Sequence, residues 1–346
     1  MLRIQLGRTG LRNWRHVIIK IFEVVAKAVV SIPFIFIIIG SEFFSNRVVL
    51  RFGKLIGEQL GHFAANTELY LCEKAEGINC PEVKCIDIFY VTAPICNFYL
   101  LNKWSSLIPH IWPSFIVKPF IWASEVLSFF GLNGESHLVV NSQHDRDIHN
   151  LYEKYSPSIQ FSNQECLVGQ RGLRDLGVPE GAKFVCLTVR DSAYLKSHLP
   201  GGNFDYHSYR DCDVTTYEQG CIALAEAGIY VIRMGARVEK KLPFSHPKVV
   251  DYATNGMRSE FLDIYLASQC LFCITNGTGF DALPMIFRKP ILQVNAVPIS
   301  YAFTWGANFL LLFKHHLDAV TGRELTIRQI FDLSETTDFY DITILI

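Results

Sequence analysis

Apolar and polar positions in the second half of the chain predict strands and helices in alternation. Short apolar runs, typical of buried strands, lie at residues 184–190, 229–234, 249–252, 271–275 and 290–294. Helical spacing of apolar positions follows at residues 162–177, 215–227, 261–268 and 280–287. Ser162 with Glu165, and Thr215 with Glu218, have the spacing of capping boxes that open two of these helices. The alternation predicts an α/β domain with a parallel sheet and helices on both faces.

The first half of the chain shows a weaker version of the same alternation. Strands are expected at residues 48–52, 84–91 and 137–141, helices at 61–71, 93–100 and 119–130, and an aromatic connection at 104–112. A chain of 346 residues is too long for one ordinary core, and the polar stretch 142–165 is typical of a connection between domains. We therefore expect an N-terminal domain at 41–150 and a C-terminal domain at 151–346, after an N-terminal segment at 1–40.

Residues 17–39 form the most apolar stretch of the chain. Residues 28–39 are apolar all round, but this run is shorter than the ~20 residues that span a bilayer, and Pro33 interrupts it. A spanning anchor, an interfacial helix, a signal peptide and a helix packed on the first domain all stay open. No small-residue cleavage site follows Ile39, which disfavours a signal peptide. Five basic residues precede the first acid, Glu23, and favour a helix lying on an anionic membrane surface.

Composition excludes some classes of protein. Half of the residues are hydrophobic, which excludes an intrinsically disordered chain, and the net charge of -1 gives no electrostatic signature of nucleic-acid binding. The ten cysteines are scattered singly among apolar neighbours, as in a reduced intracellular enzyme. Cys270 and Cys273 have CxxC spacing, but in the strand expected there they point to opposite faces, which favours core packing over a metal or redox site.

A Gly/Thr-rich turn at residues 275–279 is the strongest local signal for chemistry. It follows a buried strand and precedes a helix, so we expect free helical N–H groups at the carboxyl edge of the sheet, where α/β proteins bind ligands. Gly277 and Gly279 allow close approach of the backbone, and the other three residues offer side-chain hydrogen bonds. The turn predicts a phosphate site, with an ordinary tight turn as the alternative. Its members are Thr275, Asn276, Gly277, Thr278 and Gly279.

Two arginines follow neighbouring predicted strands and point to the same edge. Arg190, beside Asp191, ends one strand, and Arg233, two residues before Gly235, ends the next. A guanidinium group suits a diphosphate, although a structural ion pair with an aspartate is the alternative. Asp251 and Tyr252 end a further strand, where they would accept bonds from a ribose or base.

The loop at residues 191–213 is long for this kind of fold, and long loops are usually functional. Tyr194, Tyr209 and Arg210 are its candidates for closing over the donor or contacting an acceptor. The pairs Asp145-x-Asp147 and Asp211-x-Asp213 have the spacing of a divalent-metal site, but that spacing is common by chance. Asp213 is equally suited to starting the helix that follows it.

Gly61 and His62 stand where a loop is expected to enter a helix in the first domain. His62 is a candidate general base toward an acceptor hydroxyl, with a capping or solvent-facing histidine as the alternative.

Residues 185–297 resemble the C-terminal domain of a group of bacterial glycosyltransferases with two facing Rossmann-like domains, the GT-B architecture. The 60–62 and 67–70 segments of the first domain are similar to the glycine-turn entry of these enzymes, more faintly. The stretch 185–297 is about a third of the chain, and the residues in it that carry the likeness lie at 188–194, 209–210, 217, 231–235, 251–253, 258–259, 261–263, 275–279 and 290.

The resemblance implies a nucleotide-diphosphate-sugar donor on the second domain, an acceptor on the first and transfer without a bound metal or other cofactor. It implies that Arg190 and Arg233 neutralise the leaving diphosphate and that residues 276–279 cradle a phosphate. Asp281 stands where many such enzymes use a glutamate to hold the ribose.

We therefore expect a metal-independent glycosyltransferase at the cytoplasmic face of a bacterial inner membrane, acting on a lipid-linked or surface-polysaccharide acceptor. His62, Arg190 and Asp191 are its expected catalytic residues. A sugar-nucleotide epimerase of the same architecture and a non-enzymatic membrane-associated binding protein are the alternatives.

Overall fold

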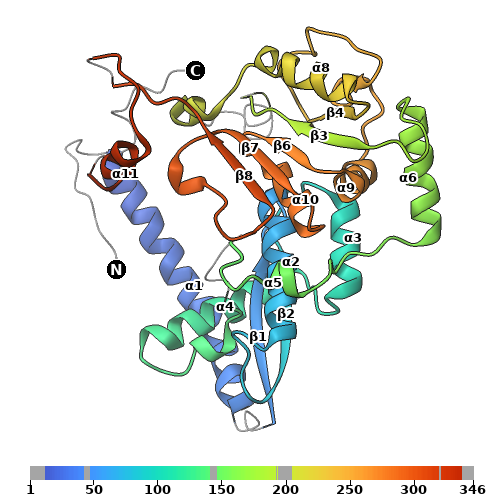
Figure 1. Cartoon of the computed structure of the whole chain (residues 1–346). Helices are drawn as coiled ribbons and strands as arrows, with labels where there is room; N and C mark the ends of the chain where they lie inside the picture. The colour runs from blue at the N-terminus through green and yellow to red at the C-terminus, as the bar shows by residue number, and fades with distance from the viewer. Residues whose placement is uncertain are drawn as a thin grey trace. The chain divides into compact units, whose positions relative to one another are not determined.

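The computed structural model describes residues 12–42, 47–140, 146–191, 193, 205–318 and 321–336 (Figure 1). These residues pack into two compact units. Residues up to 56, with 77–93 and 108–142, form the first unit, whereas 57–76, 94–107 and the chain from 143 onward form the second. The domain boundaries expected near residues 40 and 150 stay a prediction.

The second unit contains a six-stranded sheet whose strands are all parallel, as expected for its alternating pattern. The order is β5-β4-β3-β6-β7-β8, so the chain leaves β3 toward one edge and β6 toward the other. The sheet therefore has a topological switch point between β3 and β6. Its strands are β3 (Phe184–Thr188), β4 (Tyr230–Met234), β5 (Val249–Val250), β6 (Cys273–Thr275), β7 (Ile291–Ala296) and β8 (Phe309–Phe313). The last of these was not predicted.

Helices cover this sheet. The described α-helices are α2 (Leu60–Glu76), α3 (Phe98–Leu107), α5 (Leu151–Lys154), α6 (Asn163–Asp175), α8 (Glu218–Glu226), α9 (Glu260–Gln269), α10 (Ala282–Ile286) and α11 (Ile327–Thr336). Short 3-10 turns are η2 (Asp205–Arg210), η3 (Val214–Tyr217), η4 (Gly279–Asp281) and η5 (Ile299–Tyr301). The capping box of Ser162 and Glu165 is confirmed. The one predicted at Thr215 is wrong, because the carboxylate of Asp213 accepts from the N–H of Thr215 and opens η3 instead.

The core of the second unit is built on β3, where Val185, Cys186 and Leu187 are fully buried. The strand expected at 271–275 is shorter, since β6 begins only at Cys273. Cys270 lies outside it, at the C-cap of α9. Both thiols are buried and free, and burial raises the pKa of Cys273 well above its usual value. Their surroundings agree with core packing.

The first unit is organised by two parallel strands, β1 (Val48–Leu55) and β2 (Lys84–Val91). Isolated parallel bridges extend them, from Phe52 to Leu138 and from Phe89 to Ile111. The strand expected at 137–141 is thus only one bridge, after the turn η1 (Glu135–His137). The predicted helix at 93–100 is shifted to α3, which includes the fully buried Trp104 and packs in the second unit.

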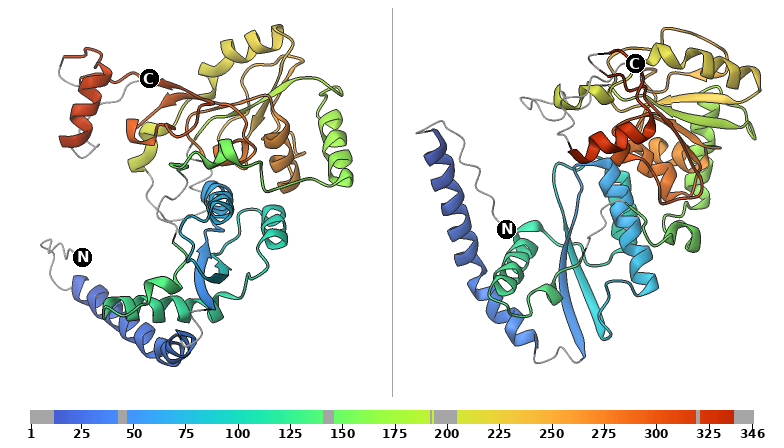
Figure 2. Two further views of the ribbon diagram at one scale, coloured as in Figure 1. Left: turned by 60° about the horizontal axis from the view of Figure 1, so that its bottom comes forward. Right: turned by 60° about the vertical axis from the view of Figure 1, so that its left-hand side comes forward.

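The apolar N-terminal stretch forms helix α1 (Arg12–Glu42), as expected, and packs along α4 (Ser114–Phe129) (Figure 2). Its part Phe22–Glu42 is long and apolar enough to cross a membrane, and only 11% of the most apolar window in it is buried. Pro33 lies within the helix.

Candidate functional site

The carboxyl ends of β3 and β6 meet at the switch point of the second unit. Thr188 donates through Oγ1 to Oγ1 of Thr275 at 2.9 Å, and both residues are buried. One step further out, the backbone N–H of Arg190 donates to Oδ1 of Asn276 at 2.7 Å. These bonds join the two strand ends at the edge of a parallel sheet where ligands bind in this architecture.

The turn at residues 275–279 is held by its own side chains. Gly277 adopts a φ of +87°, a conformation that favours glycine, and its N–H donates to Oγ1 of Thr275 at 3.1 Å. The N–H of Thr278 donates to Asp281, and that of Phe280 donates to Oγ1 of Thr278. Only the N–H of Phe280 belongs to the helical turn η4, whereas Gly277 and Thr278 precede it. The expectation of free helical N–H groups is therefore wrong for Phe280, because a short polar side chain within the turn already accepts its hydrogen bond.

Asp281 lies beneath this turn, with 2% of its surface exposed. It accepts from Oγ1 of Thr275 at 2.5 Å, from Oγ1 of Thr278 at 2.9 Å and from the N–H of Thr278 at 2.8 Å. Burial raises the pKa of Asp281 to about 6, although these hydrogen bonds oppose the shift. The carboxylate thus faces the interior of the turn and stabilises its shape, instead of reaching toward a ribose as the resemblance implied.

Two guanidinium groups flank the turn. Arg210 donates from Nη2 to the carbonyl oxygen of Gly277 at 3.0 Å and lies over the ring of Tyr301, 4.8 Å from its centroid. Arg190 donates from Nε to Oδ1 of Asp211 at 3.2 Å. Burial, and next the positive charge of Arg190, lower the pKa of Arg210. Arg210 forms no ion pair with a carboxylate in the described part of the chain, and the negative charge of Asp281 acts on it only at longer range.

A buried lysine holds the segment that carries Arg210. Lys314 directly follows β8 and is 5% exposed, and its Nζ donates to the carbonyl oxygens of Tyr209 and Asp211, both at 2.9 Å. Asn276 adds a bond from Nδ2 to the carbonyl oxygen of Arg210 at 3.0 Å. Sequence analysis placed Tyr209 and Arg210 in a lid or acceptor site and missed Lys314. The available signal was a lysine directly after an apolar strand.

Arg233 and Asp251 form a buried pair away from the turn. Arg233 is 1% exposed, and its Nη1 donates to Oδ1 of Asp251 at 3.0 Å. Asp251 also accepts from Leu242 and Thr254. This is the structural ion pair that the sequence left as the alternative to diphosphate binding.

Tyr252 and Gly235 are also enclosed near this pair. Tyr252 is fully buried, and burial raises the pKa of its hydroxyl, which bonds to the backbone of Ser259. A Cβ atom on Gly235 would lie 2.7 Å from the side chain of Val238, so the backbone at Gly235 packs closely against that side chain. Gly235 thus has a role in packing within the protein.

The acidic candidates are engaged in local contacts. Asp191 accepts from the N–H groups of Ala193 and Glu239, Asp211 pairs with Arg190, and Asp213 caps η3. Asp147 accepts from the N–H groups of Leu151 and Tyr152 at the start of α5. Tyr194 and Asp145 lie outside the described residues. Within the described ranges, no three His, Cys, Asp or Glu residues are grouped as a metal site requires.

His62 stands beside the turn, in the first turn of α2. A Cβ atom on the preceding residue, Gly61, would lie 3.2 Å from Cα of Gly279, so the two backbones are in close contact. Nδ1 of His62 is buried and has no hydrogen-bond partner among the described residues. A ring nitrogen without a partner among the described residues is a candidate proton acceptor.

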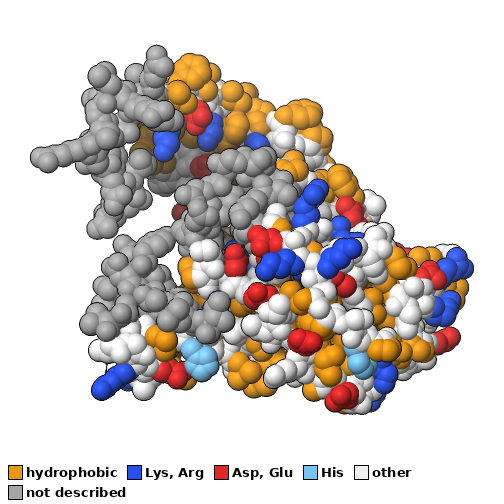
Figure 3. Space-filling model, turned by 90° about the horizontal axis from the view of Figure 1, so that it is seen from above, with side chains coloured by type: hydrophobic (Ala, Val, Ile, Leu, Met, Phe, Trp, Pro, Cys, Tyr) orange, Lys and Arg blue, Asp and Glu red, His pale blue; other side chains and the backbone are white. Residues whose placement is uncertain are grey.

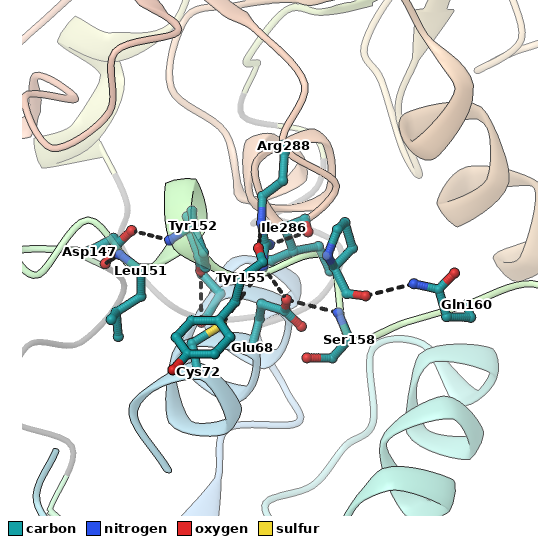
Figure 4. A network of polar contacts seen from close by, with 12 residues as sticks. Glu68, Cys72, Asp147, Leu151, Tyr152, Tyr155, Ser158, Gln160, Ile286 and Arg288 are labelled. Atoms are coloured by element: carbon teal, nitrogen blue, oxygen red, sulfur yellow. Dashed lines mark hydrogen bonds and ion pairs between the residues drawn. The ribbon is translucent and has the colours of Figure 1, made fainter. Parts of the chain in front are cut away.

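A polar network fastens α2 in this position (Figure 4). Arg288 donates from Nη2 to Oε1 of the buried Glu68 at 2.7 Å and from Nε to the carbonyl oxygen of Tyr155 at 3.0 Å. Its guanidinium group lies 4.4 Å from the ring centroid of Tyr152, whose hydroxyl donates to the carbonyl oxygen of Ala65. Since Glu68 lies less than two turns after His62 in one helix, the network sets the place of the histidine.

A pocket of about 460 Å³ adjoins the network and includes Arg288, Trp305 and Phe309 in its lining. Phe309 begins β8, so this pocket is at the amino end of that strand, whereas the turn at 275–279 lies at the carboxyl edge of the sheet.

Comparisons with known proteins give distant structural likenesses. No family model matches the chain, and no curated protein matches it. E. coli ADP-heptose LPS heptosyltransferase II is 14% identical, with a TM-score of 0.45 over 82% of this chain and 95% of that one.

Two further solved structures are similar at the same level. A family 9 glycosyl transferase from Veillonella parvula is 10% identical, with a TM-score of 0.43 over 77% of this chain and 85% of that one. The E. coli heptosyltransferase WaaC is 13% identical, with a TM-score of 0.40 over 84% and 99%. At these identities and TM-scores, the comparisons say only what the chain is similar to. Its chemistry is argued from its own residues.

Proposed function

We propose that the site at the carboxyl ends of β3 and β6 binds the diphosphate of a nucleotide-sugar donor, and that the protein is a glycosyltransferase. One observation carries the proposal: Arg190 and Arg210 flank the turn at Gly277 at the switch point, and Arg210 has no carboxylate partner among the described residues. A partly buried cation without an ion-pair partner is stabilised when an anion joins it. The planar guanidinium group of arginine can donate two parallel hydrogen bonds to a pair of diphosphate oxygens.

The same groups suit the chemistry of sugar transfer. The bond from the anomeric carbon to the diphosphate oxygen breaks as a bond to the acceptor oxygen forms, and the leaving diphosphate gains negative charge. Arg190 and Arg210 would stabilise that charge, the role that a divalent metal has in other transferases, so we propose transfer without a metal. His62 would accept the proton of the acceptor hydroxyl through its unpaired Nδ1.

Of the remaining candidates, Asn276, Gly277 and Thr278 shape the phosphate-facing turn, and Thr275, Gly279 and Asp281 hold it from below or behind. Asp191 would position the chain after Arg190 through its two backbone hydrogen bonds. We assign a structural role to the buried Arg233 and Tyr252 and to the partly buried Asp251.

We also propose a lipid-linked or surface-polysaccharide acceptor and a location at the cytoplasmic face of a bacterial inner membrane. The support is the exposure of helix α1, which keeps apolar side chains such as Phe22 and Phe36 at its surface. The enzyme and a membrane-bound acceptor would then lie at the same membrane surface.

The first test is thermal unfolding of the protein with UDP, GDP, CMP, ADP and dTDP, each with and without magnesium. A ligand at about a hundred times its dissociation constant stabilises the folded state by about 2.7 kcal/mol. We expect one diphosphate to raise Tm independently of magnesium, and Arg210→Ala to abolish the rise. Arg174→Ala, which removes an exposed arginine of α6, is the matched control. No rise with any nucleotide would contradict the proposal, and consumption of a donor without an acceptor would favour an epimerase.

A further inference from the structure

Two neighbouring helices of the first unit expose large apolar side chains. In α1, Phe22 is 73% exposed and Phe36 is 70% exposed. In and directly after α4, Phe115 is 77%, Phe129 84% and Phe130 72% exposed. We call these side chains and their apolar neighbours on the two helices the α1–α4 apolar surface. Soluble monomers rarely expose contiguous apolar patches of this kind, so the surface needs an apolar partner.

The aromatic residues of α4 are arranged as a stripe. Phe115, Trp122 and Phe129 are spaced seven residues apart, which places them on one face of the helix over roughly 20 Å. Nζ of Lys27 in α1 lies 5.7 Å from the ring centroid of Trp122, so the stripe borders α1. A long apolar stripe parallel to a helix axis suits a partner that contacts the whole length of the helix, as a membrane surface does.

The C-terminal half of α1 is attached to the core of the first unit. Phe34 packs edge-on against Phe120 at 4.7 Å, and Phe120 stacks on Phe52 of β1 at 4.4 Å. Ile38 is 2% exposed in the same cluster. The part of α1 before this attachment runs from Arg12 to about residue 30, roughly 28 Å at ~1.5 Å per residue. This is close to the ~30 Å hydrocarbon core of a bilayer, so the charges along the segment decide between a crossing and a surface position.

Charge on this free part favours an anionic surface and disfavours a crossing. Lys20, Glu23 and Lys27 are all exposed within it, where a spanning helix would place them in lipid. In sequence, six basic residues and one acid precede Ala28. On the face that Figure 3 shows, in contrast, Lys, Arg, Asp and Glu side chains are interspersed with apolar ones.

We propose that α1 and the aromatic stripe of α4 insert together into one leaflet of an anionic bilayer, so that the first unit is a monotopic membrane anchor. The inference deepens the membrane association proposed above and assigns it to a second helix, which the sequence did not indicate. It does not depend on the donor chemistry of the second unit.

Flotation of the full chain with vesicles of phosphatidylcholine and phosphatidylglycerol tests the role of α4. The variant Phe115→Ser/Phe129→Ser/Phe130→Ser should partition about tenfold less onto the vesicles than the unchanged chain, because three exposed rings leave the lipid contact. The matched control, Leu271→Ser/Leu310→Ser/Leu312→Ser, removes three exposed apolar side chains of the second unit and should partition normally. Unchanged thermal unfolding would show that both variants fold.

Protease added outside the vesicles tests the one-leaflet arrangement. An N-terminal epitope tag should be cleaved, because both ends of α1 stay on the side of addition, whereas a protected tag would overturn the arrangement. Equal partitioning of the α4 variant and the unchanged chain would overturn the role of α4. The unchanged chain could instead form a dimer in lipid-free solution and fail to bind vesicles. If the α4 variant were then monomeric, the surface would be a contact between copies of the chain. Flotation measures lipid binding alone. A negative flotation result would therefore contradict the membrane anchor and would not bear on the proposed nucleotide site.

Discussion

Nη2 of Arg210 lies 3.0 Å from the carbonyl oxygen of Gly277, and the carbonyl oxygen of Arg210 accepts from the side chain of Asn276 at 3.0 Å. The segment before η3 and the turn after β6, 66 or 67 residues apart in the chain, are thus bonded in both directions. This reciprocal contact places a partly desolvated cation on the turn in advance of any ligand. A preorganised cation of this kind loses little entropy when an anion binds.

Replacement of Arg210 should therefore weaken nucleotide binding strongly. Arg210→Ala should raise the dissociation constant of the preferred diphosphate by about tenfold to a hundredfold, since charge-assisted hydrogen bonds contribute roughly 1.5–3 kcal/mol each. Arg210→Lys should recover only part of the loss, because an ammonium group lacks the planar fork. Isothermal titration would measure both. Equal affinities for Arg210→Ala and the unchanged protein would remove Arg210 from the site.

Lys314 should act as a positioning residue. Lys314→Met keeps the length of the side chain but leaves the carbonyl oxygens of Tyr209 and Asp211 without their buried donor. We expect a several-fold rise in KM for the donor with a smaller change in kcat, since Arg210 loses its support while the rest of the site remains. A purely structural role would instead lower Tm and leave the KM of the folded protein unchanged.

Removing Glu68 should destabilise the second unit strongly. Glu68→Ala would leave the partly buried Arg288 without its counter-charge, and the loss of one partner of a fully buried pair lowers the free energy of unfolding by about 3–5 kcal/mol, an upper bound here. The double variant Glu68→Leu/Arg288→Leu should be less destabilised than the single one, because no charge is left unpaired. Urea unfolding of the two variants makes the comparison, and a double variant weaker than the single one would show that backbone bonds of Arg288 dominate.

The buried Asp281 should make stability depend on pH. Its pKa is about 6 in the folded state against a usual 3.8, so the folded state binds a proton more tightly than the unfolded chain. The contribution of this group is therefore largest below about pH 4 and falls as pH rises to about 6. The total change corresponds to roughly 3 kcal/mol.

Asp281→Asn isolates this effect, because Asp263, whose pKa burial also raises to about 6, titrates in the same range in both proteins. The unfolding free energy of the unchanged protein should fall relative to that of the variant as pH rises from about 4 through 6, and become level above about pH 7. A difference that does not change with pH would mean that Asp281 is not protonated in the folded state.

Local sequence patterns were enough for most elements of the second unit. Apolar runs such as the one that became β3, and the box of Ser162 and Glu165, act through near neighbours or through burial alone. The prediction failed where a nearby side chain changed the outcome, as at Asp213, which opens a 3-10 turn before α8. It also failed at residues 137–141, where the expected strand makes only one bridge.

The candidate site was located from sequence, but the roles within it were not. Arg190 and Arg233 both follow strands, yet Arg190 stands at the switch point, whereas Arg233 is buried against Asp251. Arg210 lies in a long loop, and Lys314 follows a strand that was not predicted. No local sequence pattern therefore connected either residue with the turn.

By itself, the sequence determined the parallel α/β character of the second unit, the apolar N-terminal helix and the position of the Gly/Thr turn, because each depends on periodicity or on conformational preference within a few residues. Only the tertiary structure decided which arginine remains without a carboxylate, which turn N–H groups are already paired, and that α4 lies beside α1 with its own exposed aromatic stripe. Those properties depend on contacts between residues far apart in the chain, and partner choice and burial across such distances leave no periodic signal in a single sequence.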